Sequence, residues 1–431
     1  MLKSVVLLAL LLPTGRLFAQ RGSEASPPVP GNTAPPMLQR PYEAVRDFLN
    51  FYAFADGTYD SSGYYASGGN AGAGIGLVVG GGASGYREWP TGVLELSYRG
   101  DYRTYPSGTD QSLTFLARKD FSRRYSLTVT ETAGILNNGG TVYSSSPEVA
   151  NPSILVQSNP FNSETRFTVT DLALSYQRSV RLSFQVSGSY FINRYSGSTS
   201  YGSNSVSGAA SVNYRVTRRT TVSGSYSHNH YIFQHNAGGS DVDSVFLTAT
   251  HELASRWTVS GSGGFSRTAS SGVEQVPLNV QIGQQIVTVV ATGKYAQTSY
   301  LPYYQGIVTH SLKHDSVSLS GGQAVSPGNG LLLAARTLGI NGFWVHNLRR
   351  SNLTFAGYYS RLTSVTSAAS QAATTRGVGV SYSYNLIHHV GLTGRYDYLN
   401  YSSFASYGGR ADNRLTFGVY FTSKDIPLGL F

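Results

Sequence analysis

The sequence predicts an all-β protein: a transmembrane antiparallel up-and-down β-barrel of about 18 strands, with 16 strands as the alternative. Three observations predict this fold. Apolar and polar residues alternate along most segments between residues 49 and 422, a glycine-centred unit repeats along them, and short polar turns alternate with longer polar connections. A period of two is the pattern of a strand whose faces meet different surroundings, and about ten residues allow a tilted strand to cross a bilayer.

The repeating unit is an alternating run that reaches a glycine, in most copies followed closely by tyrosine. Its six glycines are Gly188, Gly224, Gly261, Gly321, Gly357 and Gly394, at intervals of 36, 37, 60, 36 and 37 residues. Nearly equal intervals indicate one pair of strands in each unit. The long interval holds an insertion, 268–298, whose apolar β-prone residues predict an additional hairpin. We expect this hairpin either to fold into the lumen or to extend the strands above the membrane.

Eighteen segments fit the alternation. They lie at approximately 49–59, 71–82, 92–104, 110–119, 124–136, 165–178, 181–194, 204–216, 219–232, 241–253, 256–267, 299–312, 315–326, 334–347, 351–363, 372–385, 389–401 and 411–422. Eight tight turns and nine longer loops would return both ends of the barrel to the periplasmic side. Glycines at 72, 74, 76 and 80 interrupt the alternation in the first two segments, which leaves 16 as the alternative count. The connection 137–164 contains prolines and is expected to be an irregular external loop.

Two segments precede the predicted barrel. Residues 1–19 have the features of a Sec signal peptide, with Lys3 as the positive n-region, an apolar h-region at 5–12 and Ala19 at the cleavage site. Residues 20–47 are rich in proline and predict an extended periplasmic linker. The barrel is then expected over 48–431, in the cell outer membrane.

The composition limits the possible functions. Only 13% of residues are charged, compared with about 25% in average globular domains. Beyond the N-terminal segment, no run of about 18 apolar residues predicts a spanning helix. Because the chain has no cysteine, thiol catalysis, disulfides and Cys-ligated metals are excluded. We expect no enzyme activity, no cofactor and no metal.

Charged residues on the strands are expected to face the lumen, because a charge that faces hydrocarbon is costly. In the segment 92–104, the alternation separates the charged residues from Leu94, Leu96 and Tyr98. The predicted lumen-lining residues are Glu95, Arg99, Asp101, Arg103, Arg118, Arg215, Arg395 and Asp397. We expect no adjacent acid on the strands of Arg118 and Arg215, and we therefore predict a weak preference for anions.

Tyrosines fall at two levels of the predicted strands, late in outgoing strands and just before the tight turns. The predicted girdle residues are Tyr176, Tyr190, Tyr214, Tyr226, Tyr359, Tyr384 and Tyr396. Two such aromatic girdles are typical of a barrel that spans two membrane interfaces.

The last predicted strand closes the barrel. Its outward side chains, by alternation, are Leu415, Phe417, Val419 and Phe421. With the terminal Phe431, this end resembles the closing strand of bacterial outer-membrane barrels, close to the β-barrel porin families, although Phe431 lies ten residues beyond Phe421. The resemblance covers about residues 49–431. It implies assembly by the outer-membrane assembly machinery and identifies an architecture rather than a substrate.

Three groups of residues have the chemistry of other sites. Two aspartates and three histidines border one predicted external loop and are of types that can bind a metal, but solvated loop polarity is the favoured interpretation; they are His228, His230, His235, Asp241 and Asp243. The types needed for nucleophilic catalysis meet at His251, Glu252 and Ser255, but neighbouring strand residues point to opposite faces. The glycine-rich 68–74 lacks the Lys-Ser/Thr of a phosphate loop and fits a flexible loop.

The predicted function is passive diffusion of small hydrophilic solutes through a porin-like channel, because barrels of 16–18 strands leave an aqueous lumen. The alternative is a structural or export-associated barrel that binds surface polysaccharide or a protein partner through its loops. A soluble β-propeller needs no tyrosine girdles, and 20–47 is too short for the plug of a TonB-dependent transporter. Without Lys3 and Arg16, 30 basic residues remain against 22 acidic ones, which suits anionic lipopolysaccharide and solutes. Export makes nucleic acid an unsuitable partner.

Overall fold

The structure is a computed structural model. It describes residues 47–61, 72–105, 107–137, 141–144, 154–157, 164–196, 202–234, 238–254, 256–282, 285–326, 334–365, 372–402, 409–424 and 426–427. The predicted signal peptide and residues 20–46 of the predicted linker lie outside these ranges, and Asp47, expected to end the linker, is the first residue of a strand. Among the described residues, no helix is long and apolar enough to cross a membrane.

Eighteen long strands make up the wall of the molecule. They are β1 (Asp47–Asp60), β2 (Gly74–Trp89), β3 (Gly92–Thr104), β4 (Ser107–Asp120), β5 (Tyr125–Leu136), β8 (Thr165–Gln177), β9 (Leu182–Tyr195), β10 (Ser203–Arg215), β11 (Thr220–Phe233), β12 (Gly238–Ala254), β13 (Trp257–Ile282), β14 (Gln285–Ser311), β15 (Asp315–Ser326), β16 (Ala335–Asn347), β17 (Ser351–Ser364), β18 (Ala372–Ile387), β19 (Val390–Ser402) and β20 (Gly409–Thr422). The short strand β21 (Ile426–Pro427) pairs with the beginning of β1. A separate hairpin of β6 (Thr141–Ser144) and β7 (Ile154–Gln157) lies within 137–164, which was expected to be irregular.

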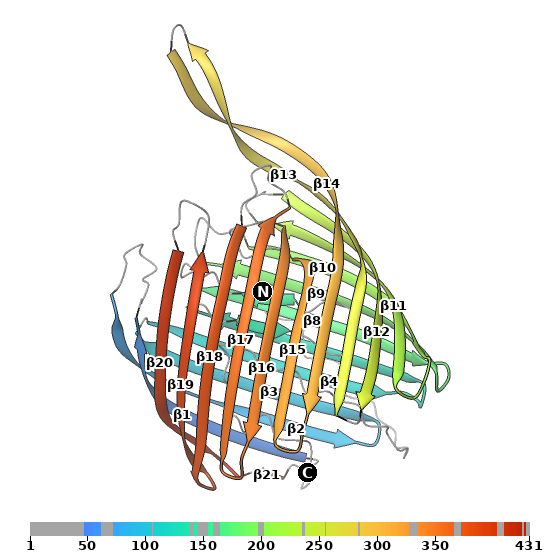
Figure 1. Cartoon of the computed structure of the whole chain (residues 1–431), viewed down its shortest axis with the longest axis vertical. Helices are drawn as coiled ribbons and strands as arrows, with labels where there is room; N and C mark the ends of the chain where they lie inside the picture. Colours follow the sequence, from blue (N-terminus) through green and yellow to red (C-terminus); the bar gives the residue numbers. More distant parts are fainter. Residues whose placement is uncertain are drawn as a thin grey trace, which may run out of the picture.

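The wall closes on itself. Each strand pairs antiparallel with its neighbours along the chain, and β20 pairs with β1 from Tyr52 opposite Thr422 to Asp60 opposite Arg414 (Figure 1). The predicted 18-strand antiparallel barrel is therefore confirmed, and the alternative of 16 strands is wrong. The two segments with the least regular alternation, β1 and β2, pair along fourteen residues and are full members of the wall.

Connections differ between the two ends of the barrel. On one side, the eight connections 90–91, 121–124, 178–181, 216–219, 255–256, 312–314, 348–350 and 388–389 are all short. The first residues of β1 lie on this side, because Asp47 is opposite Arg87 near the connection 90–91, and β21 lies there as well, because it pairs with Phe48 and Leu49. On the other side the connections are mostly longer, but β3 and β4 are joined by residues 105–106 alone, and β13 and β14 by residues 283–284 alone.

The insertion at 268–298 lengthens two wall strands. β13 and β14 pair without interruption from Trp257 opposite His310 to Ile282 opposite Gln285, and this hairpin projects far beyond the rest of the wall (Figure 1). Of the two expected arrangements, the extension of the strands is therefore the observed one.

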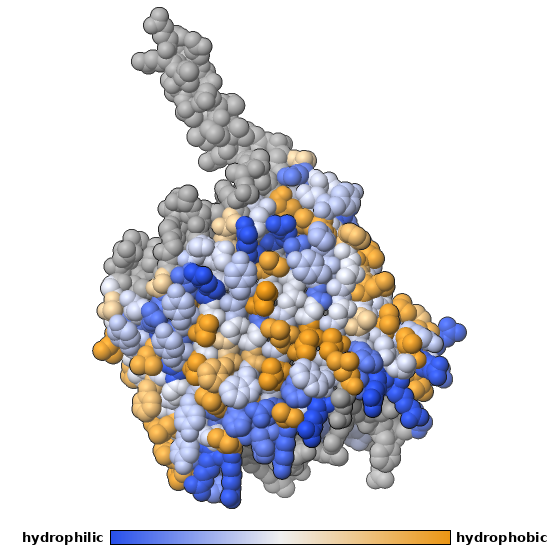
Figure 2. Space-filling model, viewed as in Figure 1, coloured by the Kyte–Doolittle hydropathy of each residue, from blue (hydrophilic) through white to orange (hydrophobic). Residues whose placement is uncertain are grey.

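The outer face of the wall is apolar. Side chains that point away from the barrel axis leave large hydrophobic groups exposed, among them Leu172, Leu247 and Leu319 at 49%, 65% and 55%. Figure 2 shows apolar side chains over the middle of the wall and hydrophilic ones gathered at its lower edge. Monomeric soluble proteins rarely expose so extended an apolar surface, whereas a barrel in a bilayer requires one. The arrangement is that of a membrane-spanning barrel.

A matched pair of substitutions on two adjacent strands tests this orientation. Phe417 lies on the outer face of β20 and is 63% exposed, whereas Thr393 lies on the inner face of β19. We expect Phe417→Arg to destabilise the barrel by up to about 2–4 kcal/mol, because its guanidinium would face hydrocarbon. The measurement is the urea midpoint of the barrel refolded in lipid vesicles. Thr393→Arg is the control, and equal shifts of the two variants would contradict the orientation.

Candidate channel lumen

One half of the inner wall is lined with hydroxyl groups. The strands β9 to β13 turn serine, threonine and asparagine inward at alternate positions, among them Ser187, Ser207, Ser227, Asn229, Ser244 and Thr268, all buried. Between β12 and β13, hydroxyls pair directly across the strands, Ser240 with Ser270 at 2.8 Å and Ser244 with Ser266 at 2.8 Å. A third pair, Thr248 with Ser262 at 2.8 Å, continues this row towards the tight turns. These small and neutral hydroxyl side chains make this side of the inner wall polar.

Charges line the opposite half, on both sides of the closing seam. We name this group the seam charge cluster; it contains Asp56 and Asp60 of β1, Arg99, Asp101 and Arg103 of β3, Asp110 of β4, Arg395 and Asp397 of β19, and Asp412 and Arg414 of β20. Arg414 Nη2 lies 2.9 Å from Asp60 Oδ2 and 3.8 Å from Asp412 Oδ2. Arg103 Nη2 lies 3.4 Å from Asp110 Oδ2, and Arg99 Nε lies 3.5 Å from Asp101 Oδ1. Each arginine of this cluster therefore has an acidic neighbour.

Glycines of β2 allow the side chains of β1 and β3 to meet inside the wall. A Cβ atom on Gly82 would lie 2.6 Å from Tyr52 Cζ, and one on Gly80 would lie 2.6 Å from both Phe54 Cζ and Asp101 Cβ. The guanidinium of Arg99 lies 5.4 Å from the centre of the Phe54 ring, a cation–π distance. Gly80 and Gly82 thus leave room on the inner face of β2 for a layer of aromatic and charged side chains, and we name this pair the glycine floor.

The structure places the other predicted lumen residues as follows. Glu95 shares the inner face of β3 with Arg99, and Arg395 and Asp397 are hydrogen-bonded to each other on β19. Arg118 was expected to lack an acid on its own strand, but Asp120 lies 3.2 Å from it.

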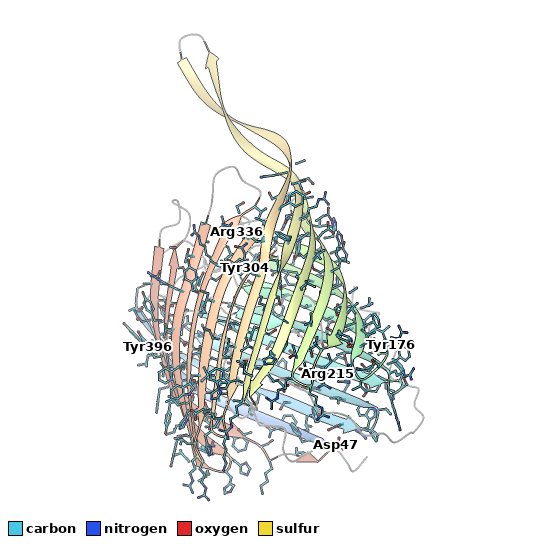
Figure 3. The ribbon with its side chains drawn as sticks, turned by 45° about the vertical axis from the view of Figure 1, so that its right-hand side comes forward. Asp47, Tyr176, Arg215, Tyr304, Arg336 and Tyr396 are labelled. Atoms are coloured by element: carbon cyan, nitrogen blue, oxygen red, sulfur yellow. The ribbon has the colours of Figure 1, made fainter. Side chains whose placement is uncertain are left out.

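Arg215 is exposed at the tight-turn end of β10 (Figure 3). Neither Arg118 nor Arg215 belongs to the seam charge cluster. That cluster holds six aspartates and the four arginines Arg99, Arg103, Arg395 and Arg414, so the predicted surplus of positive charge is absent from it.

The inner face is packed towards the long-loop end of the wall. Leu136, Phe167, Val169 and Phe191 form one buried cluster on β5, β8 and β9. A second cluster brings Tyr231, Phe233 and Val242 together with Ala334, next to β16. Because β12 to β15 separate β11 from β16 in the wall, this contact crosses the interior and narrows the lumen at that level.

All seven predicted girdle tyrosines lie on the outer face. Tyr190, Tyr214, Tyr226 and Tyr396 are 43–47% exposed, and Tyr176 stacks on Tyr125 at 4.7 Å (Figure 3). Tyr359 and Tyr384 are half-buried on β17 and β18. Leu415, Phe417, Val419 and Phe421 of the closing strand are 47–63% exposed and point the same way.

The described residues of the other candidate sites lie as follows. His228 Nδ1 lies 2.9 Å from Asp243 and His230 Nδ1 lies 2.6 Å from Asp241, all on the outer face of β11 and β12. Within the described ranges, no group of three or more His, Asp or Glu is arranged to hold a metal. His235, Ser255 and residues 68–71 lie outside those ranges. His251 points outward and contacts Thr220, whereas Glu252 lies on the opposite face.

Sequence reasoning missed half of the seam charge cluster. Asp56, Asp60, Asp110, Asp412 and Arg414 stand on the same alternation as the residues that were found. Their positions in the alternation of β1, β4 and β20 were sufficient to predict that these side chains point inward. Their mutual proximity could not be predicted in this way, because it depends on the register between the first and the last strand.

Comparisons with solved structures find similar barrels. OccK2 (OpdF) of Pseudomonas aeruginosa is 12% identical over 87% of this chain and 98% of its own, with a TM-score of 0.44. OpdQ of the same species is 11% identical over 89% and 98%, with a TM-score of 0.40, and the ferric-catecholate import receptor Fiu of E. coli K12 is 7% identical over 86% and 81%, with a TM-score of 0.42. No protein-family model and no curated protein sequence matches. These neighbours are bacterial outer-membrane barrels, and the likeness is one of fold.

The glycine floor predicts a steric penalty that is confined to the inner face. Gly82→Ala would place a Cβ 2.1 Å from the carbonyl oxygen of Tyr98, so we expect a loss of about 1–3 kcal/mol in unfolding free energy. Gly208→Ala on the outer face meets nothing within 4 Å and is expected to stay within about 0.5 kcal/mol of the parent. Chemical unfolding in micelles measures the unfolding free energy of both variants. Equal stabilities of the two variants would contradict the steric role of Gly82.

The pair across the closing seam predicts non-additive stability. The side chain of Asp60 is fully buried, so Arg414→Gln removes its guanidinium partner and is expected to cost roughly 3–5 kcal/mol. Adding Asp60→Asn should recover most of that loss, because the buried charge disappears with its partner. The same unfolding assay gives the double-mutant cycle, and a double variant as unstable as Arg414→Gln would contradict the pairing.

Proposed function

We propose that this protein is an outer-membrane channel for the passive diffusion of small hydrophilic solutes. The observation that carries the proposal is a closed 18-strand barrel whose outer face is apolar and whose inner face is lined with hydroxyls and paired charges. Barrels of this strand number leave an aqueous channel, and a polar inner face is what such a channel requires.

Transport through such a lumen needs no chemical step. Solutes would be selected by width and by the field of the inner side chains. The hydroxyl half offers neutral hydrogen-bond partners, and the charged half is close to internally compensated, so we expect weak discrimination by charge. The narrowest level is expected where Ala334 meets Tyr231 and Phe233 across the interior.

A second candidate function is partner binding through the external side, by a structural or export-associated barrel that holds surface polysaccharide or another protein. The specific observation that favours it is the hairpin of β13 and β14, which continues far past the neighbouring strands. β12 ends its pairing with β13 at Gly272, and β15 begins its pairing with β14 at Tyr304.

Single-channel recording in planar bilayers tests the main proposal. The unmodified protein is expected to conduct without any partner. Ser262→Trp places an indole on the inner face of β13. We expect it to lower the single-channel conductance, because the larger side chain narrows the lumen at that level.

Gly263→Trp is the matched control on the adjacent residue, since Gly263 faces outward with nothing within 4 Å. Its conductance should equal that of the parent. A folded parent protein that stays closed in the bilayer would overturn the channel and leave partner binding as the surviving function.

A further inference from the structure

The tight-turn edge of the barrel carries unbalanced positive charge. Two arginines occur in each of four of its eight turns, 121–124, 178–181, 216–219 and 348–350. Two further turns contain Arg256 and Lys313, and no turn contains aspartate or glutamate. All ten basic side chains are exposed, and we name them the basic ring. The two turns without Lys or Arg, 90–91 and 388–389, lie on either side of the closing seam, so the ring follows the rest of the circumference.

The described acids do not neutralise the basic ring. None of its ten side chains forms an ion pair with a described acid. The acids next to the turns are directed elsewhere: Asp120 lies 3.2 Å from Arg118, Asp315 lies 2.7 Å from His346, and Glu252 points to the inner face. Cations that are close together without acids repel one another, and an anionic surface outside the chain would compensate them.

Exposed apolar side chains accompany the cations in the same turns. Phe121, Val216, Leu312 and Leu348 are 63%, 49%, 40% and 57% exposed. Each continues the outward alternation of the strand that precedes it. Segments that lie in a membrane interface combine apolar side chains with Lys and Arg in this way. The composition of the turns therefore favours a lipid surface as the partner.

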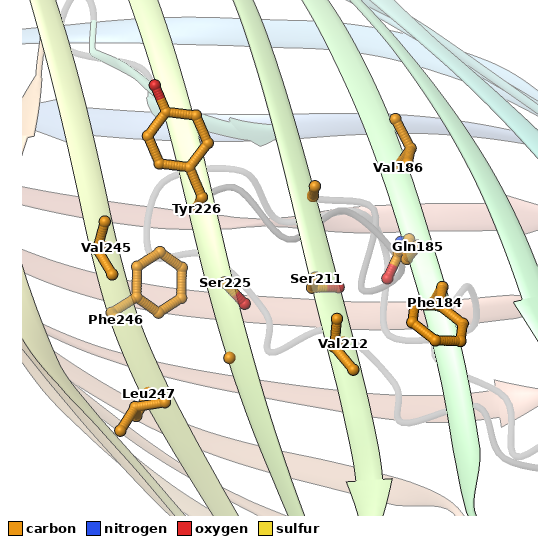
Figure 4. A pocket seen from close by; sticks show the side chains of 12 residues that line it. Phe184, Gln185, Val186, Ser211, Val212, Ser225, Tyr226, Val245, Phe246 and Leu247 are labelled. Carbon is orange, nitrogen blue, oxygen red and sulfur yellow. The ribbon is translucent and has the colours of Figure 1, made fainter.

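Strand β10 shows the level of the basic ring relative to the apolar wall. Val212 borders a shallow groove on the outer face of β9 to β12 (Figure 4). The girdle residue Tyr214 and then Val216 follow at the next outward positions, and Arg218 and Arg219 come directly after them. Because tyrosine marks the level where hydrocarbon meets headgroups, these two arginines lie at the headgroup level or just beyond it.

All three tryptophans of the chain lie near the same edge. Trp89 ends β2, Trp257 begins β13, and Trp344 lies three residues before the end of β16. The strand alternation places all three on the outer face, and Trp257 is 41% exposed. Tryptophan is enriched where a membrane meets water. The tryptophans therefore indicate, independently of the tyrosines, that the membrane interface lies next to the basic ring.

We propose that the basic ring binds the anionic phospholipid headgroups of the leaflet in which the tight-turn edge ends. The headgroup phosphates pair with the turn cations, and the outward apolar side chains of the same turns contact the adjoining acyl chains. A leaflet fits the ring better than an acidic protein does, because a leaflet surrounds the barrel whereas a protein docks on one side. This inference rests on the membrane-spanning barrel and not on its conductance. It assigns the excess positive charge of the chain to one edge and to one class of lipid.

Tryptophan quenching by brominated lipids tests the proposal, because the three tryptophans report on the lipids at this edge. The unmodified protein is refolded in vesicles of mixed phosphatidylcholine and phosphatidylglycerol, with one or the other lipid brominated in its acyl chains. The two degrees of quenching give the relative affinity of the edge for the two lipids. We expect phosphatidylglycerol to be favoured by roughly threefold or more. The preference should fall to near parity in about 1 M KCl, where the Debye length is about 3 Å.

Two quadruple variants locate the preference. The first removes the cations of three successive turns next to Trp257 and Trp344, by Arg256→Gln, Lys313→Gln, Arg349→Gln and Arg350→Gln. It should lose most of the preference for phosphatidylglycerol.

The control removes four outward arginines near the long-loop edge, by Arg166→Gln, Arg194→Gln, Arg267→Gln and Arg376→Gln. Each of these four has a polar partner in the wall, such as Glu164 at 2.5 Å from Arg166 and Asp243 at 3.4 Å from Arg267. The control should keep the preference of the parent.

Equal quenching by the two brominated lipids in the unmodified protein, or a preference that persists in concentrated KCl, overturns the proposal. Retention of the preference by the first variant, or its loss from the control, overturns the assignment to the basic ring. If the first variant does not fold, the salt dependence of the unmodified protein still decides. A protein that conducts without lipid preference overturns only this inference, and one that prefers phosphatidylglycerol without conducting overturns only the channel.

Discussion

The whole structure depends on the pairing of every wall strand with two neighbours, including the first with the last. Backbone N–H and C=O groups that face hydrocarbon have no water to bind, so an unpaired edge inside a bilayer is not tolerated. The antiparallel ladder between β1 and β20 removes that edge. Its register also decides which side chains meet inside, since it sets Asp60 opposite Arg414. Closure of the wall therefore also forms the Asp60–Arg414 pair of the seam charge cluster.

The alternation of side chains along each strand gives the two faces of the wall opposite polarity. Outward positions hold apolar and aromatic side chains, and inward positions hold hydroxyls on β9 to β13 and charges near the seam. The charged half is crowded, and β2 accommodates it by omitting side chains at Gly80 and Gly82. The strands that carry inward hydroxyls need no such glycines on their neighbours, because serine is small. This asymmetry gives the lumen one neutral polar side and one side of nearly compensated charge.

The outer face is not uniform either. Over most of its circumference it is an apolar surface bordered by tyrosines, but on β9 to β13 it combines a groove with exposed histidines, aspartates and an arginine. The His–Asp pairs, which suggested a metal from their residue types, lie on the outer face of β11 and β12.

The sequence by itself determined the barrel architecture, the strand number to within one hairpin, the direction of most strand side chains and the side of the tight turns. Those properties follow from a period of two and from turn composition, which are local. Tertiary structure alone decided the proximities: Asp60 with Arg414, Arg103 with Asp110, and Ala334 with Tyr231. It also decided that the inserted hairpin extends the wall, and that the glycines of β2 form a floor. These depend on the register between strands and on the curvature of the closed wall, which bring distant residues together, and no local pattern encodes them.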